Sequence, residues 1–395
     1  MSNQPFPVTL PPKGAHINFS DIHQSEITFG QQVFNIEKTD YYKPKLFSGQ
    51  PPGVFNTLHQ AHPEIERLFK LQKNSDWDEQ ETLEGNDNKI QFKTMAPYKV
   101  EPMKRTLGFQ WETDTTIGRT LAIFASFAAT NDQLFEIYMR IVDNENLHAR
   151  TYSEIIKSSF DDVEAVLTDI LNARETLQRL AKAGAVFTKM RRTLCEVELG
   201  LRDRDEQYYQ EIYLFIVTVY CVERIQFLSS FAITFAYGQA GHFIEIANSV
   251  RLICRDEYEI HVKLGKYIVQ KFAEDAITVE AKALAFHQVK GIIDEIREAE
   301  HASLDYQLET VAHEGLFGFS VEDFRSYVDH CCGDVYKTFG ITPDFEVPKT
   351  HRLPYMNDWT NNDNFQQSPQ EESSVNYRLM PLARDDRDKI YPINF

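Results

Sequence analysis

The sequence of 395 residues predicts an all-α protein in which long helices pack as a bundle. The first observation is the stretch 143–152, DNENLHARTY, which places a carboxylate, an imidazole and a phenol on one side of a helix. The second is the stretch 212–236, which is apolar nearly all round but carries a carboxylate near its middle. The third is the stretch 241–272, whose helical rhythm contains a second Glu and His pair. We therefore expect a helical bundle organised around a buried metal centre.

The composition is that of a soluble globular protein, with 42% apolar and 25% charged residues. The formal net charge of −18 argues against direct binding to nucleic acid or to an anionic membrane surface. The five cysteines are odd in number and lack zinc-site spacing, which favours a reducing compartment. The N-terminus lacks the basic and apolar regions of a signal peptide. These features predict a cytoplasmic protein.

Composition also divides the chain into three parts. Residues 1–57 are punctuated by proline, cannot form one continuous helix and predict an N-terminal extension over the surface. Residues 58–342 hold the helical domain. Residues 343–395 are polar and contain proline without helical periodicity, which predicts a flexible tail whose scattered aromatic residues could anchor another protein.

Helical periodicity marks the expected members of the bundle. The polar stretch 78–89 is expected to be a loop, and Trp77 stands just before it in a polar setting where a lone tryptophan is otherwise an edge packing residue. Asp161 and Asp162 are typical helix-starting residues, and Gly184 is a typical helix end. The expected helices cover residues 64–71, 97–119, 131–160, 161–184, 212–236, 241–272, 278–313 and 320–338.

The motif in the helix over 131–160 has the spacing of a metal-ligand pair. At about 100° per residue, Glu145, His148 and Tyr152 fall at roughly 0°, 300° and 340° and share one narrow face. Helical bundles build two-metal carboxylate sites from such Glu-x-x-His units, with four helices contributing ligands. One such motif also arises by chance as a solvated pair, so the other ligands must come from elsewhere in the chain.

The apolar stretch 212–236 is long enough to span a bilayer, but Glu223 and Arg224 at its midpoint favour a buried helix of a soluble bundle. A carboxylate among Phe, Ile and Val must be protonated, bridged by water or paired with a cation. Because Arg224 points about 100° away from Glu223 on the helix, a bound metal is one solution. A protonated or water-bridged core Glu is the other.

The stretch 241–272 supplies Glu257 and His261, about 40° apart on a regular helix. Asp114, in the helix over 97–119, completes the set. Together with Glu223 and the pair at 145 and 148, these residues give four carboxylates and two imidazoles on four helices. This is the ligand set of a non-haem two-metal site, because hard anionic oxygen neutralises paired cations.

With these motifs in view, the sequence resembles the small, radical-generating subunit of class I ribonucleotide reductases of the aerobic bacterial and phage type. The resemblance runs from FGQQVFN at 29 to the C-terminus. It is most specific at DTTIGR from Asp114, at ENLHARTYSEII from Glu145, at VERIQFLSSFAITFA followed by RLICRDE, and at DNFQQSPQEESSVNY in the tail. It implies a ferritin-like bundle, in the host cytoplasm if the chain is encoded by a phage.

The resemblance implies a di-iron centre and a stable radical on Tyr152. Manganese accepts the same ligands, so the choice of metal stays open. The implied metal ligands are Asp114, Glu145, His148, Glu223, Glu257 and His261.

The resemblance further implies a radical pocket and a transfer route. Phe227, Phe231 and Ile253 are similar to the apolar residues that shield the radical, although a Phe stripe is otherwise plain core. Trp77 and Asp256 are similar to the members of a proton-coupled electron-transfer route from His148 to the surface, although Asp256 could otherwise be a surface charge. In the tail, Glu371 and Tyr377 are similar to residues that pass the radical to the large catalytic subunit, and IYPINF to the docking peptide.

One residue departs from the family pattern. The family has Glu-x-x-His at the second motif, whereas here the imidazole comes one position late and Ile260 stands where His is expected. A one-residue π-bulge would absorb this insertion, and a regular helical spacing of four would also work. His261 is the expected ligand, with Glu259 as the alternative oxygen ligand.

The resemblance implies that the chain is one subunit of ribonucleoside-diphosphate reductase. It would activate O2, receive electrons from a donor, form a homodimer and pass its radical to a large subunit that reduces ribonucleotides, with no nucleic acid or membrane as partner. Two alternatives share the ligand set. A di-iron oxidase or hydroxylase needs a substrate cavity in place of Tyr152 and a transfer route, and a ferritin-like iron store needs neither.

Overall fold

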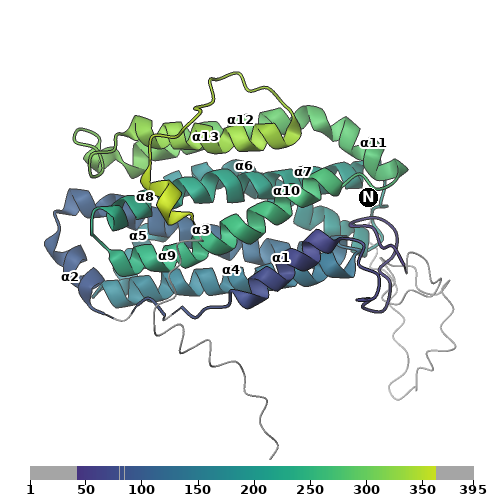
Figure 1. Ribbon diagram of the computed structural model, residues 1–395, viewed down its shortest axis with the longest axis horizontal. Coiled ribbons are helices and arrows are strands. Elements are labelled where there is room, and N and C mark those ends of the chain that lie inside the picture. The colour runs from purple at the N-terminus through teal and green to yellow at the C-terminus, as the bar shows by residue number, and fades with distance from the viewer. Residues whose placement is uncertain (1–41, 80, 84, 362–395) are drawn as a thin grey trace, which may run out of the picture.

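A computed structural model describes residues 42–361 except 80 and 84, and these residues form an all-α bundle without a β-strand. The long helices run side by side, and α12 and α13 lie together along one side (Figure 1). The helices, with π and 3-10 turns labelled η, are α1 Pro63–Asn74, α2 Asp87–Thr94, α3 Pro97–Ala128, α4 Asp132–Ser159, α5 Val163–Leu171, α6 Arg174–Glu198, α7 Glu206–Cys221, η3 Val222–Phe227, α8 Leu228–Gln239, α9 Ile244–Asp256, η4 Glu257–His261, α10 Val262–Lys271, α11 Ala276–Ala285, η5 Phe286–Gln288, α12 Val289–Gln307, η6 Glu309–Val311, α13 Val321–Phe339 and α14 Tyr355–Trp359.

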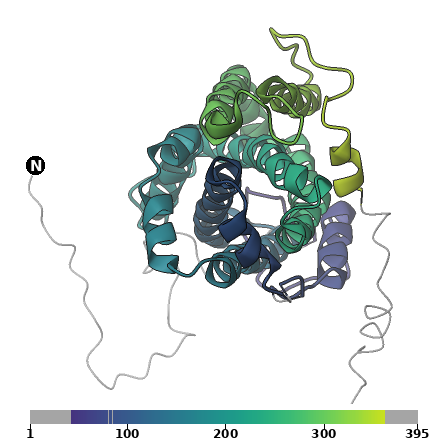
Figure 2. The ribbon, with the colours of Figure 1, turned by 90° about the vertical axis from the view of Figure 1, so that its left-hand side faces the viewer.

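The core lies between α3, α4 and the run formed by α7, η3 and α8. Seen along its axis, the bundle surrounds α3 (Figure 2), which packs most extensively against α4. The run Glu206–Gln239 has the length and apolarity of a membrane span, but 89% of its most apolar window is buried inside the protein. It is therefore the central buried helix that its midpoint charges predicted.

Helix starts follow the expected capping chemistry. Asn131 Oδ1 accepts the Leu134 amide at 3.0 Å at the start of α4, and Asp162 Oδ1 accepts the Ala165 amide at 3.0 Å at the start of α5. Both side chains satisfy amides that have no partner within the first turn of a helix.

The single helix expected over 161–184 is wrong, because the structure forms α5 and α6 there. Asn172 ends α5, where its Nδ2 donates to Thr168 O at 2.8 Å beside its own backbone amide, and the extended backbone of Ala173 separates α5 from α6. Gly184 does not end α6. It lies in the helix interior with open space around its α-carbon, so the flanking helix formers continue the helix to Glu198.

The loop expected over 78–89 is also shorter than predicted, because α2 begins at Asp87. Its Phe92 lies 4.4 Å, between ring centroids, from both Phe160 and Phe243. Asn88 Nδ2 donates to Glu245 Oε2 at 2.8 Å. Tertiary packing therefore stabilises a segment that has almost no amphipathic pattern of its own.

Parts of both terminal segments belong to the folded body. In the N-terminal segment, Leu46 and Phe47 are buried, and Leu46 O accepts the Thr130 amide at 3.0 Å. After residue 342, helix α14 packs against α8, and Tyr355 Oη donates to Ala232 O at 2.7 Å. The tail expected over 343–395 thus includes residues that pack on the bundle as far as α14.

Candidate metal centre

The structure brings the six predicted ligands to one buried place. Asp114 comes from α3, Glu145 and His148 from α4, Glu223 from η3, and the remaining two from η4. Their donor atoms form two groups of four that share Glu145 and a second glutamate. One group is Asp114, Glu145, His148 and Glu257, and the other is Glu145, Glu223, Glu257 and His261. Two overlapping groups with two shared carboxylates are the arrangement that a pair of neighbouring metal ions requires.

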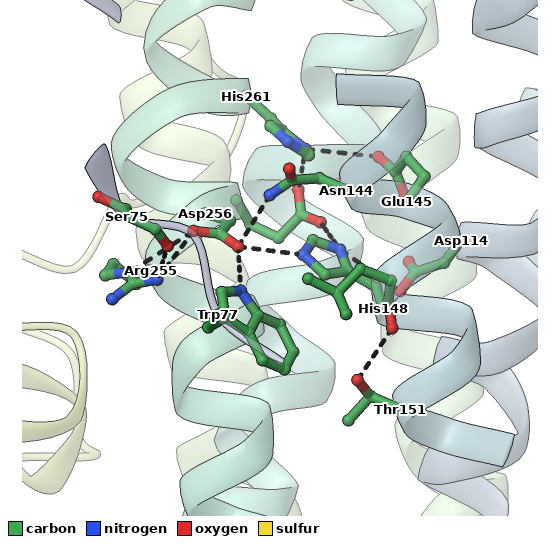
Figure 3. Close-up of polar contacts among 12 residues, drawn as sticks. Ser75, Trp77, Asp114, Asn144, Glu145, His148, Thr151, Arg255, Asp256 and His261 are labelled. Atoms are coloured by element: carbon green, nitrogen blue, oxygen red, sulfur yellow. Dashed lines mark hydrogen bonds and ion pairs between the residues drawn. The ribbon is translucent and has the colours of Figure 1, made fainter. Parts of the chain in front are cut away.

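Both histidines face the shared carboxylates. His148 Nδ1 lies 3.1 Å from Glu257 Oε1 and 3.8 Å from Asp114 Oδ2. His261 Nδ1 lies 2.7 Å from Glu257 Oε2 and 3.4 Å from Glu145 Oε1 (Figure 3). Glycine helps to bring the helices together, because a β-carbon at Gly118 of α3 would lie 3.0 Å from Glu145 Cβ.

The donor atoms of this site are buried and lack hydrogen-bond partners, although they lie at ion-pair distance. They are both carboxylate oxygens of Asp114, Glu145 and Glu257, one of Glu223, Nδ1 of His148, and both ring nitrogens of His261. Buried polar atoms are normally hydrogen-bonded, and buried charges are paired or bind metals. Four carboxylates carry the charge that two divalent cations neutralise. The residues therefore fit a pair of metal ions.

The electrostatics of the metal-free site supports the same conclusion. Burial and the charge of Glu145 raise the pKa of Asp114 well above its usual value. Burial and the charges of Glu257 and Glu145 do the same to the pKa of Glu223. Against the effect of burial, Glu257 and Glu145 raise the pKa of His261 to about 10. Without cations, the site therefore holds protons on groups that must release them to bind metal.

The late histidine of the second motif is accommodated by a π-turn. Residues Glu257–His261 form η4, and the additional residue per turn brings His261 to the inner side, 4% exposed. Ile260 is buried as well, but it has no donor atom. Glu259 points outward and pairs with Lys263 on the surface. The geometry therefore favours His261 over Glu259 as a ligand.

A hydrogen-bonded chain leads away from His148 (Figure 3). Its Nε2–H donates to Asp256 Oδ2 at 3.4 Å, and Trp77 Nε1–H donates to the same oxygen at 2.7 Å. The Trp77 and His148 rings stack with centroids 6.1 Å apart. Asp256 is buried, so it is not a surface charge, and it fixes the ring so that Nδ1 faces the other ligands.

Sequence reasoning missed a further partner of this chain. Asn144 Nδ2 donates to Asp256 Oδ2 at 2.9 Å. Asn144 precedes His148 by four residues and therefore shares its face of α4, so helical spacing was a signal that could have found it.

Tyr152 is fully buried, and its hydroxyl has no hydrogen-bond partner among the described residues. Tyr152 follows His148 by about one turn of α4, so the two side chains share a face of that helix. Burial raises the pKa of Tyr152 well above its usual value, and the charges of Asp114, Glu257 and Glu145 raise it further. The three predicted pocket residues, Phe227, Phe231 and Ile253, are also fully buried in the same core.

Two predicted residues of the transfer route, Glu371 and Tyr377, lie outside the described residues, as does the proposed docking peptide IYPINF. Their roles stay predictions from the sequence.

Comparisons with known proteins agree on one family. The family model "Ribonucleotide reductase, small chain" matches residues 54–352. The chain is 22% identical over 379 residues to the ribonucleoside-diphosphate reductase subunit beta of Enterobacteria phage T4, covering 91% of this chain and 97% of that protein. It is 22% identical over 360 residues to ribonucleoside-diphosphate reductase 1 subunit beta of Escherichia coli O157:H7, covering 87% and 94% of the two chains.

Two solved structures show the same fold. The ribonucleotide reductase R2 subunit from Clostridium botulinum aligns with a TM-score of 0.70 at 15% identity, covering 84% of this chain and 98% of that chain. The dimanganese(II)-NrdF of Streptococcus sanguinis aligns with a TM-score of 0.59 at 13% identity, covering 78% and 99%.

Proposed function

Because the chain belongs to the ribonucleotide reductase small-chain family, we propose that its buried centre holds two iron ions and generates a stable radical on Tyr152. The chain is thus a component of an oxidoreductase that works with a large-subunit partner. The observation that carries the radical proposal is the fully buried Tyr152 phenol, which lies one turn of α4 beyond His148 and has no hydrogen-bond partner at Oη among the described residues.

When bound, a pair of redox-active metal ions supplies the one-electron oxidation of a phenol at the expense of dioxygen. Asp114, Glu145, His148 and Glu257 would hold one ion, and Glu145, Glu223, Glu257 and His261 would hold the other. Carboxylates suit this task because anionic oxygen neutralises the cations and can change its binding mode.

The chain's own residues prepare and protect the radical. Since burial raises its pKa, the Tyr152 phenol keeps its proton at Oη until it is oxidised, when it gives up an electron and that proton. Phe227 and Phe231, stacked with centroids 5.7 Å apart, would exclude water and reductants from the ring. Ile253 completes this apolar wall.

We further propose that the radical leaves through His148, Asp256 and Trp77. The Asp256 carboxylate accepts hydrogen bonds from both rings, so one group can hold or move a proton at each end of this path. Trp77 is half-buried, so the route reaches the surface of the bundle. From there, Glu371 and Tyr377 of the C-terminal segment 343–395 would carry the radical to the large subunit, in an assembly that also contains a second copy of this chain.

The first experiment loads the metal-free protein with Fe(II) and oxygen and records the electron paramagnetic resonance spectrum. We expect a tyrosyl signal in the wild type and none in Tyr152→Phe, with equal iron content in both. A signal that survives the substitution would assign the radical to another residue. Parallel loading with Mn(II) tests the second metal, because a tyrosyl signal only in the manganese protein would overturn the choice of iron.

A second experiment tests the tail. Deletion of the residues after Pro369 is expected to leave metal content and the Tyr152 radical intact and to abolish turnover with the large subunit. Turnover at the wild-type rate would contradict the docking role. A di-iron hydroxylase would show the opposite behaviour, with oxidation of a small substrate and no need of the tail.

A further inference from the structure

A second group of buried charges lies beside the metal centre and includes none of its ligands. Arg179 of α6 and Glu300 of α12 are 4% and 0% exposed. They form a two-pronged ion pair, with Nε to Oε1 at 2.5 Å and Nη2 to Oε2 at 2.5 Å. The two residues are 121 positions apart in the chain, so the pair joins two helices that are distant in the sequence.

This pair is bonded directly to η3, the π-turn that carries Glu223. Arg179 Nη2 donates to Gln226 O at 3.1 Å. In return, Gln226 Nε2 donates to Glu300 Oε1 at 2.9 Å and to Arg179 O at 3.2 Å. Ser229 Oγ, just past the turn, donates to Glu300 and, at 3.0 Å, to Gln226 O. The backbone and side chain of Gln226 are therefore both held by the pair.

The pair also supports the wall of the radical pocket. The Arg179 guanidinium lies 3.3 Å from the centroid of the Phe109 ring. Phe109 in turn packs against Phe227, with centroids 6.3 Å apart. The charged pair thus contacts the π-turn directly and, through the Phe109 ring, also contacts Phe227, one of the residues predicted to line the radical pocket.

Buried ion pairs are poor stabilisers, because removing two charges from water offsets most of their attraction, and well-packed apolar side chains can replace them without loss of stability. A π-turn, in contrast, is a rare local geometry that needs support from its surroundings. We propose that Arg179 and Glu300 are positioning residues that hold the π-turn Val222–Phe227, so that Glu223 faces the metal ions and Phe227 faces Tyr152. The metal and radical parts of this proposal rest on the proposed function.

The test replaces the pair by apolar residues in the full chain, as Arg179→Met with Glu300→Leu. Hydrogen exchange of the metal-free protein is the first measurement, because it needs neither metal nor activity. We expect backbone amides of residues 223–231 to exchange at least about tenfold faster than in the wild type, with the amides of α4 unchanged and thermal unfolding at the wild-type temperature. After loading with iron and oxygen, we expect the Tyr152 radical to decay at least about tenfold faster.

The matched control is Arg297→Met with Asp329→Leu. It removes another Arg and carboxylate pair, between α12 and α13, with Nε to Oδ1 at 2.6 Å, and neither residue is hydrogen-bonded to η3. The control is expected to leave exchange in 223–231 and radical decay unchanged. Equal exchange rates in the test variant and the wild type would overturn the proposal, because that result is expected of a pair that does not hold the π-turn.

Should the double variant not fold, Gln226→Met removes the side-chain bonds between the π-turn and the pair, and it leaves the Arg179 bond to the backbone oxygen of residue 226 and the Arg179–Glu300 pair in place. It is expected to accelerate exchange in 223–231 by at least about threefold, and an unchanged rate would overturn the proposal. A wild-type protein without a tyrosyl signal would instead reject the proposed function, and the exchange result would still decide whether the pair holds the turn.

Discussion

The metal centre and the Arg179–Glu300 pair both bury ionisable groups in one helical core, yet only the pair balances its charge from within the chain. At the metal centre, carboxylate oxygens of Asp114 and Glu145 have no hydrogen-bond partner. At the pair, both contacts between the guanidinium and the carboxylate measure 2.5 Å, and Gln226 and Ser229 add hydrogen bonds to the same carboxylate, so that only Nη1 of the guanidinium is left without a hydrogen-bond partner among the described residues.

The difference separates two uses of buried charge. Buried charges that are paired with each other maintain the fold, because removing one of them leaves the other buried without a counter-charge. An arrangement of like charges that is not satisfied needs a ligand of opposite charge from outside the chain, and it is stable without that ligand only in a protonated form. The raised pKa of Asp114 and of Glu223 is the electrostatic mark of the second kind.

The largest expected effect is that of metal on stability. Loading both positions at about 1,000 times the dissociation constant should raise the free energy of unfolding by about 8 kcal/mol, at about 4 kcal/mol per ion. Urea unfolding of metal-free and loaded protein measures this difference. Glu257→Ala, which removes a carboxylate shared by both groups, should abolish most of it. A metal-free protein as stable as the loaded one would break the comparison.

The next effect compares two buried glutamates in the metal-free protein. Glu300→Gln leaves the Arg179 guanidinium buried without its counter-charge and should lower the free energy of unfolding by about 3–5 kcal/mol. Glu223→Gln should change it by less than about 1 kcal/mol, because burial and the neighbouring carboxylates raise the pKa of Glu223 and so favour its neutral form, which a glutamine amide resembles.

Both variants are measured by urea unfolding at neutral pH, and metal binding is then assayed separately. Glu223→Gln should weaken metal binding, whereas the stability loss of Glu300→Gln should appear in the metal-free and the loaded protein alike. Equal destabilisation by the two substitutions in the metal-free protein would contradict the distinction between the two kinds of buried charge.

The grouping of the candidate ligands could be predicted from the sequence because its signals are local. Glu145 with His148 and Glu257 with His261 each lie on one helix, so spacing alone shows that they share a face. An all-α bundle followed from the same periodicity, since long apolar stripes at helical spacing leave few other folds. The buried helix Glu206–Gln239 was recognisable because charges at the middle of an apolar run exclude lipid.

What the sequence could not predict depends on contacts between distant segments. Arg179 and Glu300 each look like ordinary surface charges of an amphipathic helix, and nothing in the spacing relates residues on α6 and α12. The π-turn at Val222–Phe227 was not predicted either, because one additional residue per turn leaves no mark on a segment that is buried on all sides. At Glu257–His261 the late histidine did leave a mark, and there a π-bulge was one of the expected solutions.

A smaller effect separates His261 from Glu259. His261→Ala should weaken metal binding at one of the two positions by about 100-fold, or about 3 kcal/mol, because it removes a buried donor next to Glu257. Glu259→Ala should leave metal stoichiometry unchanged and alter stability by less than about 0.5 kcal/mol, since it loses only a surface pair with Lys263. Metal analysis of both proteins decides, and loss of metal in Glu259→Ala alone would reverse the assignment.

The smallest effect concerns a charge at the surface that is satisfied by its neighbours. Asp275 caps α11 by accepting the Thr278 amide at 3.0 Å, and its other oxygen accepts Ser48 Oγ at 2.6 Å and Lys45 Nζ at 2.9 Å. Although burial raises it, these bonds together hold the pKa of Asp275 below its usual value.

A depressed pKa means that this stabilisation is present above the unfolded pKa of about 3.9 and is lost as the pH falls through the lower folded value. Asp275→Ala should therefore lower the free energy of unfolding by about 0.5–2 kcal/mol at pH 7, and the difference from wild type should shrink as the solution is acidified below pH 4. Asp275→Ser, which keeps a capping oxygen without the charge, should recover part of the loss. If the difference between wild type and Asp275→Ala instead grew on acidification, the neighbours of Asp275 would destabilise its charged form. Hydrogen bonding from within the chain would then not distinguish this charge from those of the metal centre.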